Sequence, residues 1–312
     1  MNILKTRDDQ ELVRFDAQPN GSFKLADNVN CNWINHDQGF SVKEIRPRIE
    51  PWLTSLFQSE HLSLLTGSGL THAIHRLATS KPAAGMENTT FSEFNDQISS
   101  QAQVSAVKAG RSVANFEDQL RIANELLRGL EIQNDDRAAK LKSEIEDQMD
   151  SFADSVLESE YGIAAADETS REPAFNTLIN FLMSFASRIG TRDRLNIFTT
   201  NYDRLIETGA ELAGLHLLDR FLGNLMPIFR SSRLDLDMHY NPPGIRGEPR
   251  YLEGVARFTK LHGSLDWVQA NNEIRRIGLP FGAESIAPYL NAPALQNATS
   301  HELMIYPNAA KD

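Results

Sequence analysis

Apolar residues along the chain follow two patterns, one typical of helices and one typical of buried strands. Spacings of three and four residues predict amphipathic helices over residues 70–77, 116–130, 141–156, 175–189 and 205–215. Short runs that suit a strand and are too brief for a helix occur at His61–Thr66, Leu195–Phe198, Arg257–Leu261 and Leu303–Tyr306. Strands that alternate with helices predict an α/β fold in which right-handed crossovers join parallel strands.

Other segments give weaker patterns. Residues 1–40 are mixed and rich in Asn and Asp, which predicts extended or irregular structure. From Ser41 the apolar spacing is close to helical, but Pro47 and Pro51 interrupt it and favour a short or kinked helix. Pro173 suits the first turn of the helix that follows it. Prolines and glycines across residues 216–255 indicate loops and short strands.

The middle of the chain, residues 80–173, carries long amphipathic segments and no alternation typical of strands. It therefore predicts an antiparallel helical pair inserted between the first and second units of the sheet. The expected organisation is an N-terminal segment over residues 1–60, an α/β domain over 61–79 and 174–312, and a helical insertion over 80–173. The insertion has either a structural or oligomerising role, or it covers a nucleotide site.

Three of the predicted strands end in small or polar residues that suit a binding site. Gly67-Ser-Gly69 opens a helix, as in phosphate-binding turns, where glycines offer free φ angles and close backbone approach and the helix terminus offers unpaired N–H groups. Asn201 and Asp203 follow the second strand, and His262-Gly263 follows the third. Each alone has a simpler explanation: a plain helix start, a cap or Asx turn, and a hydrogen-bonded structural histidine. Because carboxyl ends of parallel strands meet at one edge, their joint occurrence favours one ligand site.

Composition narrows the classes of function. The 312 residues include 42 acidic and 31 basic side chains, a net charge of −11, which argues against direct binding of nucleic acid and leaves such a role to a partner. Cys31 is the single cysteine, so an intramolecular disulfide and a Cys₄ or Cys₂His₂ zinc site are ruled out, and no metal is expected. The amino terminus does not match a signal peptide, and no run approaches a membrane span. A soluble cytoplasmic protein with no membrane contact is expected.

Three blocks of the chain resemble, in order, blocks of the sirtuin-like fold: Leu64-Leu-Thr-Gly-Ser-Gly69, Phe198-Thr-Thr-Asn-Tyr-Asp203 and Lys260-Leu-His-Gly-Ser264. They are most similar to the sirtuin-like domains of bacterial anti-phage defence proteins, which hydrolyse NAD. The resemblance covers residues 61–79 and 174–312. It implies a Rossmann-like parallel sheet with helices on both faces, and NAD as the substrate.

The resemblance also implies how the site binds NAD. Asn201 would lie beside the nicotinamide ribose and hold the attacking water, and Asp203 would bind the nicotinamide side or orient its neighbours. His262 would contact the ribose hydroxyls and act as a base or orienting group. These three are the expected catalytic residues, and they also contact NAD. The other residues expected to contact NAD are Gly67, Ser68 and Gly69 at the pyrophosphate, together with Thr200, Gly263 and Ser264.

The chain departs from the family pattern in ways that bear on the reaction. Thr200 stands where deacylating sirtuins carry Gln, and the residues after Gly69 do not continue the family pattern. The zinc module that helps sirtuins hold acyl-lysine peptides needs more than one cysteine, and a helical insertion takes its place. These losses favour water over acyl-lysine as the acceptor. The chain ends soon after Pro307, before the blocks that hold the adenosine half, so it is a fragment or lacks those contacts, and no adenine site is assigned.

The expected function is that of an NAD glycohydrolase that releases nicotinamide and ADP-ribose and depletes NAD in antiviral defence. The alternatives are an NAD-dependent protein deacylase and a subunit that senses NAD or ADP-ribose, or acts as a scaffold, without turnover. Relatives of this type often form homo-oligomers, and some pair with a HerA-type ATPase that handles DNA. A homo-oligomer and a HerA-type ATPase are accordingly the expected partners, with regulation by assembly.

Overall fold

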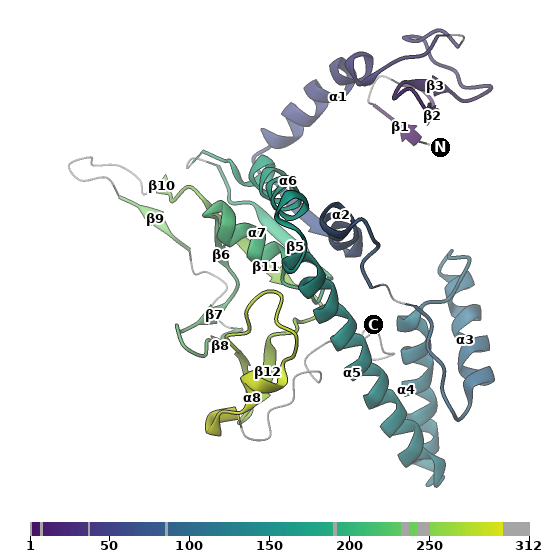
Figure 1. Ribbon diagram of the computed structural model, residues 1–312, viewed down its shortest axis with the longest axis vertical. Coiled ribbons are helices and arrows are strands. Elements are labelled where there is room, and N and C mark those ends of the chain that lie inside the picture. Colours follow the sequence, from purple (N-terminus) through teal and green to yellow (C-terminus); the bar gives the residue numbers. More distant parts are fainter. Residues whose placement is uncertain are drawn as a thin grey trace. The chain divides into compact units, whose positions relative to one another are not determined.

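The computed structural model describes residues 2–6, 9–36, 38–84, 87–189, 192–231, 237–241 and 250–295 (Figure 1). The chain divides into two compact units, Met1–Leu62 and Ser63–Asp312. Among the helices in these ranges, none is long and apolar enough to cross a membrane. The apolar run at Leu303–Tyr306 lies outside the described residues.

The first unit contains a small antiparallel sheet in the order β1-β2-β3. Of the extended or irregular structure expected for residues 1–40, these strands are the extended kind: Val13 and Phe15 are buried on either side of the exposed Arg14, as a half-buried strand requires. The turn before β3 contains Gly21 at a φ of 78°, a conformation that glycine adopts freely. The strands are β1 (Asn2–Leu4), β2 (Val13–Ala17) and β3 (Phe23–Leu25).

Helix α1 (Val42–Phe57) runs as one element through both of its prolines, so of the short or kinked helix that was expected, the short alternative is wrong. Ser41 and Glu44 form a capping box that satisfies N–H groups at its start. Pro47 and Pro51 each remove only one N–H donor, and the remaining hydrogen bonds continue the helix.

The second unit is built on a parallel sheet in the order β4-β5-β11-β6. Its register sets Thr66, Thr199 and Lys260, the last residues of three strands, side by side. The predicted convergence of strand ends at one edge is therefore confirmed. The strands are β4 (Ser63–Thr66), β5 (Asn196–Thr199), β11 (Val255–Lys260) and β6 (His216–Leu218).

Three helices pack on one another as a single layer beside this sheet: α2 (Ser68–Thr79), α6 (Glu168–Ala186) and α7 (Leu205–Ala213). Leu64, Ile197 and Phe258 are paired in register and buried on one face. Their neighbour Leu65, on the edge strand β4, points to the other face and is 69% exposed. Helix α6 begins at Glu168, which places Pro173 inside the helix and not in its first turn.

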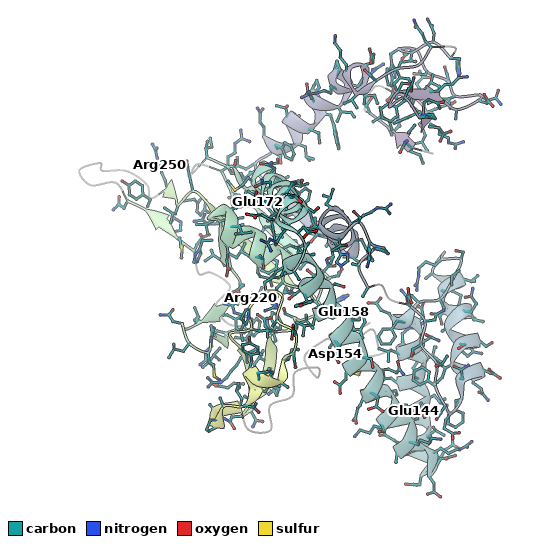
Figure 2. All side chains as sticks on the ribbon, viewed as in Figure 1. Glu144, Asp154, Glu158, Glu172, Arg220 and Arg250 are labelled. Atoms are coloured by element: carbon teal, nitrogen blue, oxygen red, sulfur yellow. The ribbon has the colours of Figure 1, made fainter. Side chains whose placement is uncertain are left out.

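The insertion contains the two predicted helices, α4 (Phe116–Gln133) and α5 (Arg137–Ala164), and an unpredicted one, α3 (Asn95–Lys108). Helix α3 buries mainly small side chains, Ala102 and Ala106 with Ile98, so its sequence lacks a strong apolar stripe. Helix α5 also packs against α2. The acidic side chains of Glu144, Asp154 and Glu158 follow one another along α5 (Figure 2).

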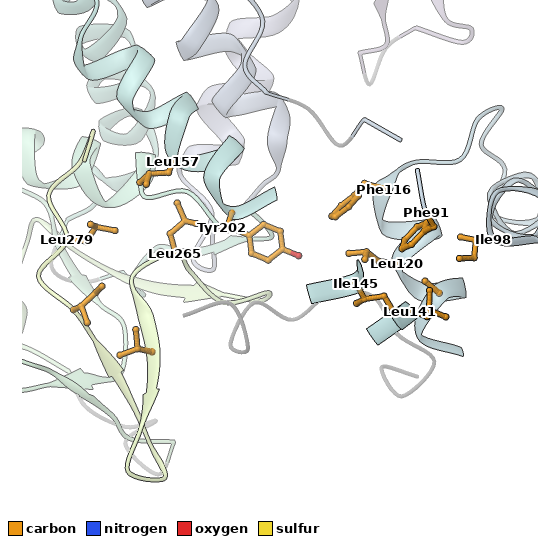
Figure 3. Close-up of a cluster of buried hydrophobic side chains, with 14 of the residues drawn as sticks. Phe91, Ile98, Phe116, Leu120, Leu141, Ile145, Leu157, Tyr202, Leu265 and Leu279 are labelled. Atoms are coloured by element: carbon orange, nitrogen blue, oxygen red, sulfur yellow. The ribbon is translucent and has the colours of Figure 1, made fainter. Parts of the chain in front are cut away.

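A single buried cluster joins the insertion to the segments that follow the sheet (Figure 3). Phe116, Leu120 and Leu141 of the insertion share it with Tyr202 and Leu265, which follow β5 and β11.

The predicted loops and short strands over residues 216–255 are confirmed. The strands there are β6, β7 (Phe221–Leu222), β8 (Ile228–Phe229), β9 (His239–Tyr240) and β10 (Arg250–Tyr251). The elements that follow β11 are β12 (Trp267–Ala270), β13 (Glu273–Arg276), α8 (Ala287–Leu290) and the 3₁₀ helix η1 (Pro293–Leu295).

Candidate active site

A cavity of about 450 Å³ opens at the carboxyl edge of the parallel sheet. Three chain segments that the sequence places far apart meet in its wall: the start of α2, the loop after β5, and the turn after β11. Of the residues expected to contact NAD, this cavity is lined by Ser68, Thr200, Asn201, Asp203 and His262.

The glycine turn lies at the start of α2, with Gly67 as the N-cap. Gly67 has a φ of −135°, and neither Gly67 nor Gly69 is among the residues of positive φ, so the conformational freedom of glycine is not what these positions use. A Cβ atom at Gly69 would meet nothing within 4 Å, and one at Gly67 would meet only Thr200 Oγ1 at 3.6 Å. The described residues therefore leave open space beside both glycines. This space is consistent with a ligand that approaches the N–H groups of α2.

The side chain of Asn201 is held in one orientation by two hydrogen bonds. Its Nδ2 donates to the carbonyl oxygen of Gly67 at 3.1 Å and to Thr71 Oγ1 at 2.9 Å. A carbonyl only accepts, so the –NH₂ group must face Gly67, and the oxygen Oδ1 is left as an acceptor. Asn201 is 8% exposed and lines the cavity, which gives this acceptor a fixed position in the wall.

Thr71 connects Asn201 to Asp203. Its hydroxyl accepts from the Asn201 amide and donates to Asp203 Oδ2 at 2.6 Å, while Asp203 Oδ1 accepts from the backbone N–H of Leu205 at 3.0 Å. Each carboxylate oxygen thus accepts one hydrogen bond from the protein, and Asp203 also lines the cavity. Sequence reasoning missed Thr71, although its position one turn after the glycines of α2 was a usable signal.

His262 lies in the turn after β11 and is half-buried beside Tyr202, with ring centroids 6.0 Å apart. Gly263 has a φ of 87°, so this turn requires glycine for its backbone. Ser264 is fully buried, and its hydroxyl is within 3.4 Å of the Tyr202 carbonyl oxygen. Neither Gly263 nor Ser264 lines the cavity; both shape the loop that presents His262.

The insertion closes one side of the cavity. Asn115 and Glu117 from the start of α4 line it, together with Phe152, Val156 and Ser159 of α5. Helix α5 of the insertion therefore packs against α2 and also supplies part of the cavity wall. His72 of α2 also lines the cavity, and no Lys or Arg is among the described residues that do so.

Tyr202 anchors the loop after β5 in the apolar cluster. Its ring is 3% exposed and packs edge-on against Phe152 with centroids 5.5 Å apart, and Phe152 stacks on Phe116. A buried aromatic anchor between Asn201 and Asp203 fixes both polar side chains toward α2. Over the described ranges, no group of three or more His, Cys, Asp or Glu side chains is arranged to hold a metal ion.

No protein-family model matches the chain, and no characterised protein matches it in sequence.

Proposed function

We propose that the protein is an NAD hydrolase that cleaves the nicotinamide–ribose bond and releases nicotinamide and ADP-ribose. One observation carries the proposal: a helix N-terminus opened by glycines, an oriented amide and an imidazole line a single cavity although they come from three distant segments. A sirtuin-like, Rossmann-type arrangement of the sheet is part of this proposal.

The chemistry of the bond fits these groups. As the C1′–N bond breaks, nicotinamide leaves as a neutral molecule and positive charge develops on the ribose, so polar acceptors aimed at that sugar lower the barrier. Asn201 Oδ1 is such an acceptor and would hold the water whose oxygen forms the new bond to C1′. His262 would take the proton that this water loses and pass it to solvent. The N–H groups at the start of α2 would hold the pyrophosphate.

Water is favoured over acyl-lysine as the acceptor because a single cysteine cannot build the zinc module that helps sirtuins hold acyl-lysine peptides. The insertion instead lines the cavity with the apolar side chains of Phe152 and Val156. Asp203 serves the reaction through Thr71, since its two oxygens bind protein groups. NAD depletion during phage infection, assembly into a homo-oligomer and pairing with a HerA-type ATPase are the biological setting that we propose with it.

Incubation of the purified chain with NAD, followed by chromatography of the products, tests the proposal directly. Asn201→Ala and His262→Ala should each abolish nicotinamide release and leave the circular dichroism spectrum unchanged. Release that depends on an added acyl-lysine peptide would instead indicate a deacylase. Tight NAD binding without product, with and without partners, would indicate a sensing subunit and remove the hydrolase.

A further inference from the structure

The groups of the proposed site come from two loops that follow neighbouring strands. Asn201 lies in the loop after β5, and His262 lies in the turn after β11. The register of these two strands ends at Thr199 and Lys260. The separation between the amide and the imidazole therefore depends on contacts made beyond the strands.

Lys260 makes such contacts with both loops. Its Nζ donates to the backbone carbonyl of Asp203 and approaches that of Tyr202 at 3.4 Å, which fixes the loop after β5. The same Nζ donates to Ser264 Oγ at 2.8 Å, which fixes the turn after β11. It also pairs with Glu207 Oε1 of α7 at 2.9 Å.

The position of this lysine follows from strand alternation. Lys260 is two residues after the buried Phe258 and points to the same face, beneath α7, where its side chain is 2% exposed. A buried ammonium is costly unless acceptors surround it, and here a carboxylate, a hydroxyl and backbone carbonyls do so. Such a group stabilises less than an apolar side chain of similar size, and what it adds is a defined arrangement of its acceptors.

We propose that Lys260 is a positioning residue that holds the loop of Asn201 at a fixed distance from the turn of His262. The inference rests on the proposed NAD hydrolysis. Lys260 is not among the residues that line the cavity, so it acts through the backbone of Tyr202 and Asp203 and through Ser264. It takes no part in proton transfer.

Lys260→Met keeps most of the length of the side chain and removes its donors. A misplacement of about 1 Å between reacting groups costs on the order of 100-fold in rate, so kcat for nicotinamide release should fall by 10- to 100-fold, roughly, while KM for NAD changes little. Ser264→Ala removes one of the contacts and should lower kcat less. It also keeps the idea testable should Lys260→Met not fold.

Arg194 offers a matched control at the opposite end of the sheet. It is likewise a buried cation, bonded to Asp237 and to the backbone carbonyls of Leu252 and Met238, and it precedes β5. Arg194→Met should cost comparable stability and leave kcat per folded molecule unchanged. Wild-type kcat in folded Lys260→Met, or an equal loss of kcat in Arg194→Met, would overturn the inference.

A second readout separates this inference from the proposed activity. The histidine Cε1–H resonance of His262 in NMR spectra reports its surroundings without any turnover. Lys260→Met should shift this resonance and Arg194→Met should not. Absence of NAD cleavage by the wild type would remove the hydrolase, whereas an unshifted resonance in Lys260→Met would remove the positioning role.

Discussion

Replacing Thr71 by valine removes one hydroxyl from the wall of the cavity and keeps a branched side chain of similar size. That hydroxyl accepts from Asn201 Nδ2 at 2.9 Å and donates to Asp203 Oδ2 at 2.6 Å. Valine can do neither, so the Asp203 carboxylate loses a donor in a buried site and the Asn201 amide keeps only its bond to Gly67.

The size of the effect follows from these contacts. A hydrogen bond to a charged group contributes about 1.5–3 kcal/mol, and a neutral one about 1 kcal/mol. The free energy of unfolding should therefore fall by about 2–4 kcal/mol. Since Asn201 can then rotate away from the position that we assign to the attacking water, kcat should fall by roughly 10- to 100-fold. Thr71→Ser keeps the hydroxyl and should restore most of both.

Urea denaturation and nicotinamide release measure the two effects separately. Thr79→Val is the control on the same helix, because the Thr79 hydroxyl donates to the His75 carbonyl at 2.8 Å and Thr79 does not line the cavity. In a double-mutant cycle with Asp203→Asn, the coupling energy should be on the order of 1–3 kcal/mol. Additive effects of the two changes, or a Thr71→Val protein with wild-type kcat, would refute the relay.

Three further predictions concern single side chains. Gly69→Ala should stabilise α2 by about 0.5–1 kcal/mol, because the added Cβ meets no described atom, and it should raise KM for NAD. Gly129→Ala, where the added Cβ also meets no described atom, should stabilise α4 and leave KM unchanged. Equal KM values in the two variants would contradict binding of the pyrophosphate at the start of α2. His72 lines the same cavity, so His72→Ala should raise KM for NAD, and an unchanged KM would exclude a contact between this side chain and the ligand. Burial raises the pKa of Glu207 from 4.5 to about 7, so the folded chain holds this proton more tightly than the unfolded chain. The resulting stability, about 3 kcal/mol, is complete below pH 4.5 and lost as the pH rises through about 7. Glu207→Gln should therefore flatten the fall in unfolding free energy between pH 5 and 8, and an unchanged slope would show another group is responsible.

Local pattern was sufficient for the central elements of the sheet. The run at Leu195–Phe198 gave β5, the alternation around Phe258 gave β11, and the polar residues after each gave the candidate site. These predictions succeeded because a buried strand and an amphipathic helix must carry apolar residues at periods that the chain alone displays. Helix α3, with its small buried side chains, has no such period and was missed.

The sequence by itself determined which residues follow the parallel strands, and hence that Asn201 and His262 share one edge. Only the tertiary structure decided which partners hold each group there. Thr71 and Lys260 act on residues more than fifty positions away in the chain, through hydrogen bonds that no local period records. The physical reason is that strand and helix periods fix the face on which a side chain lies, whereas its partners depend on which elements the fold brings opposite that face.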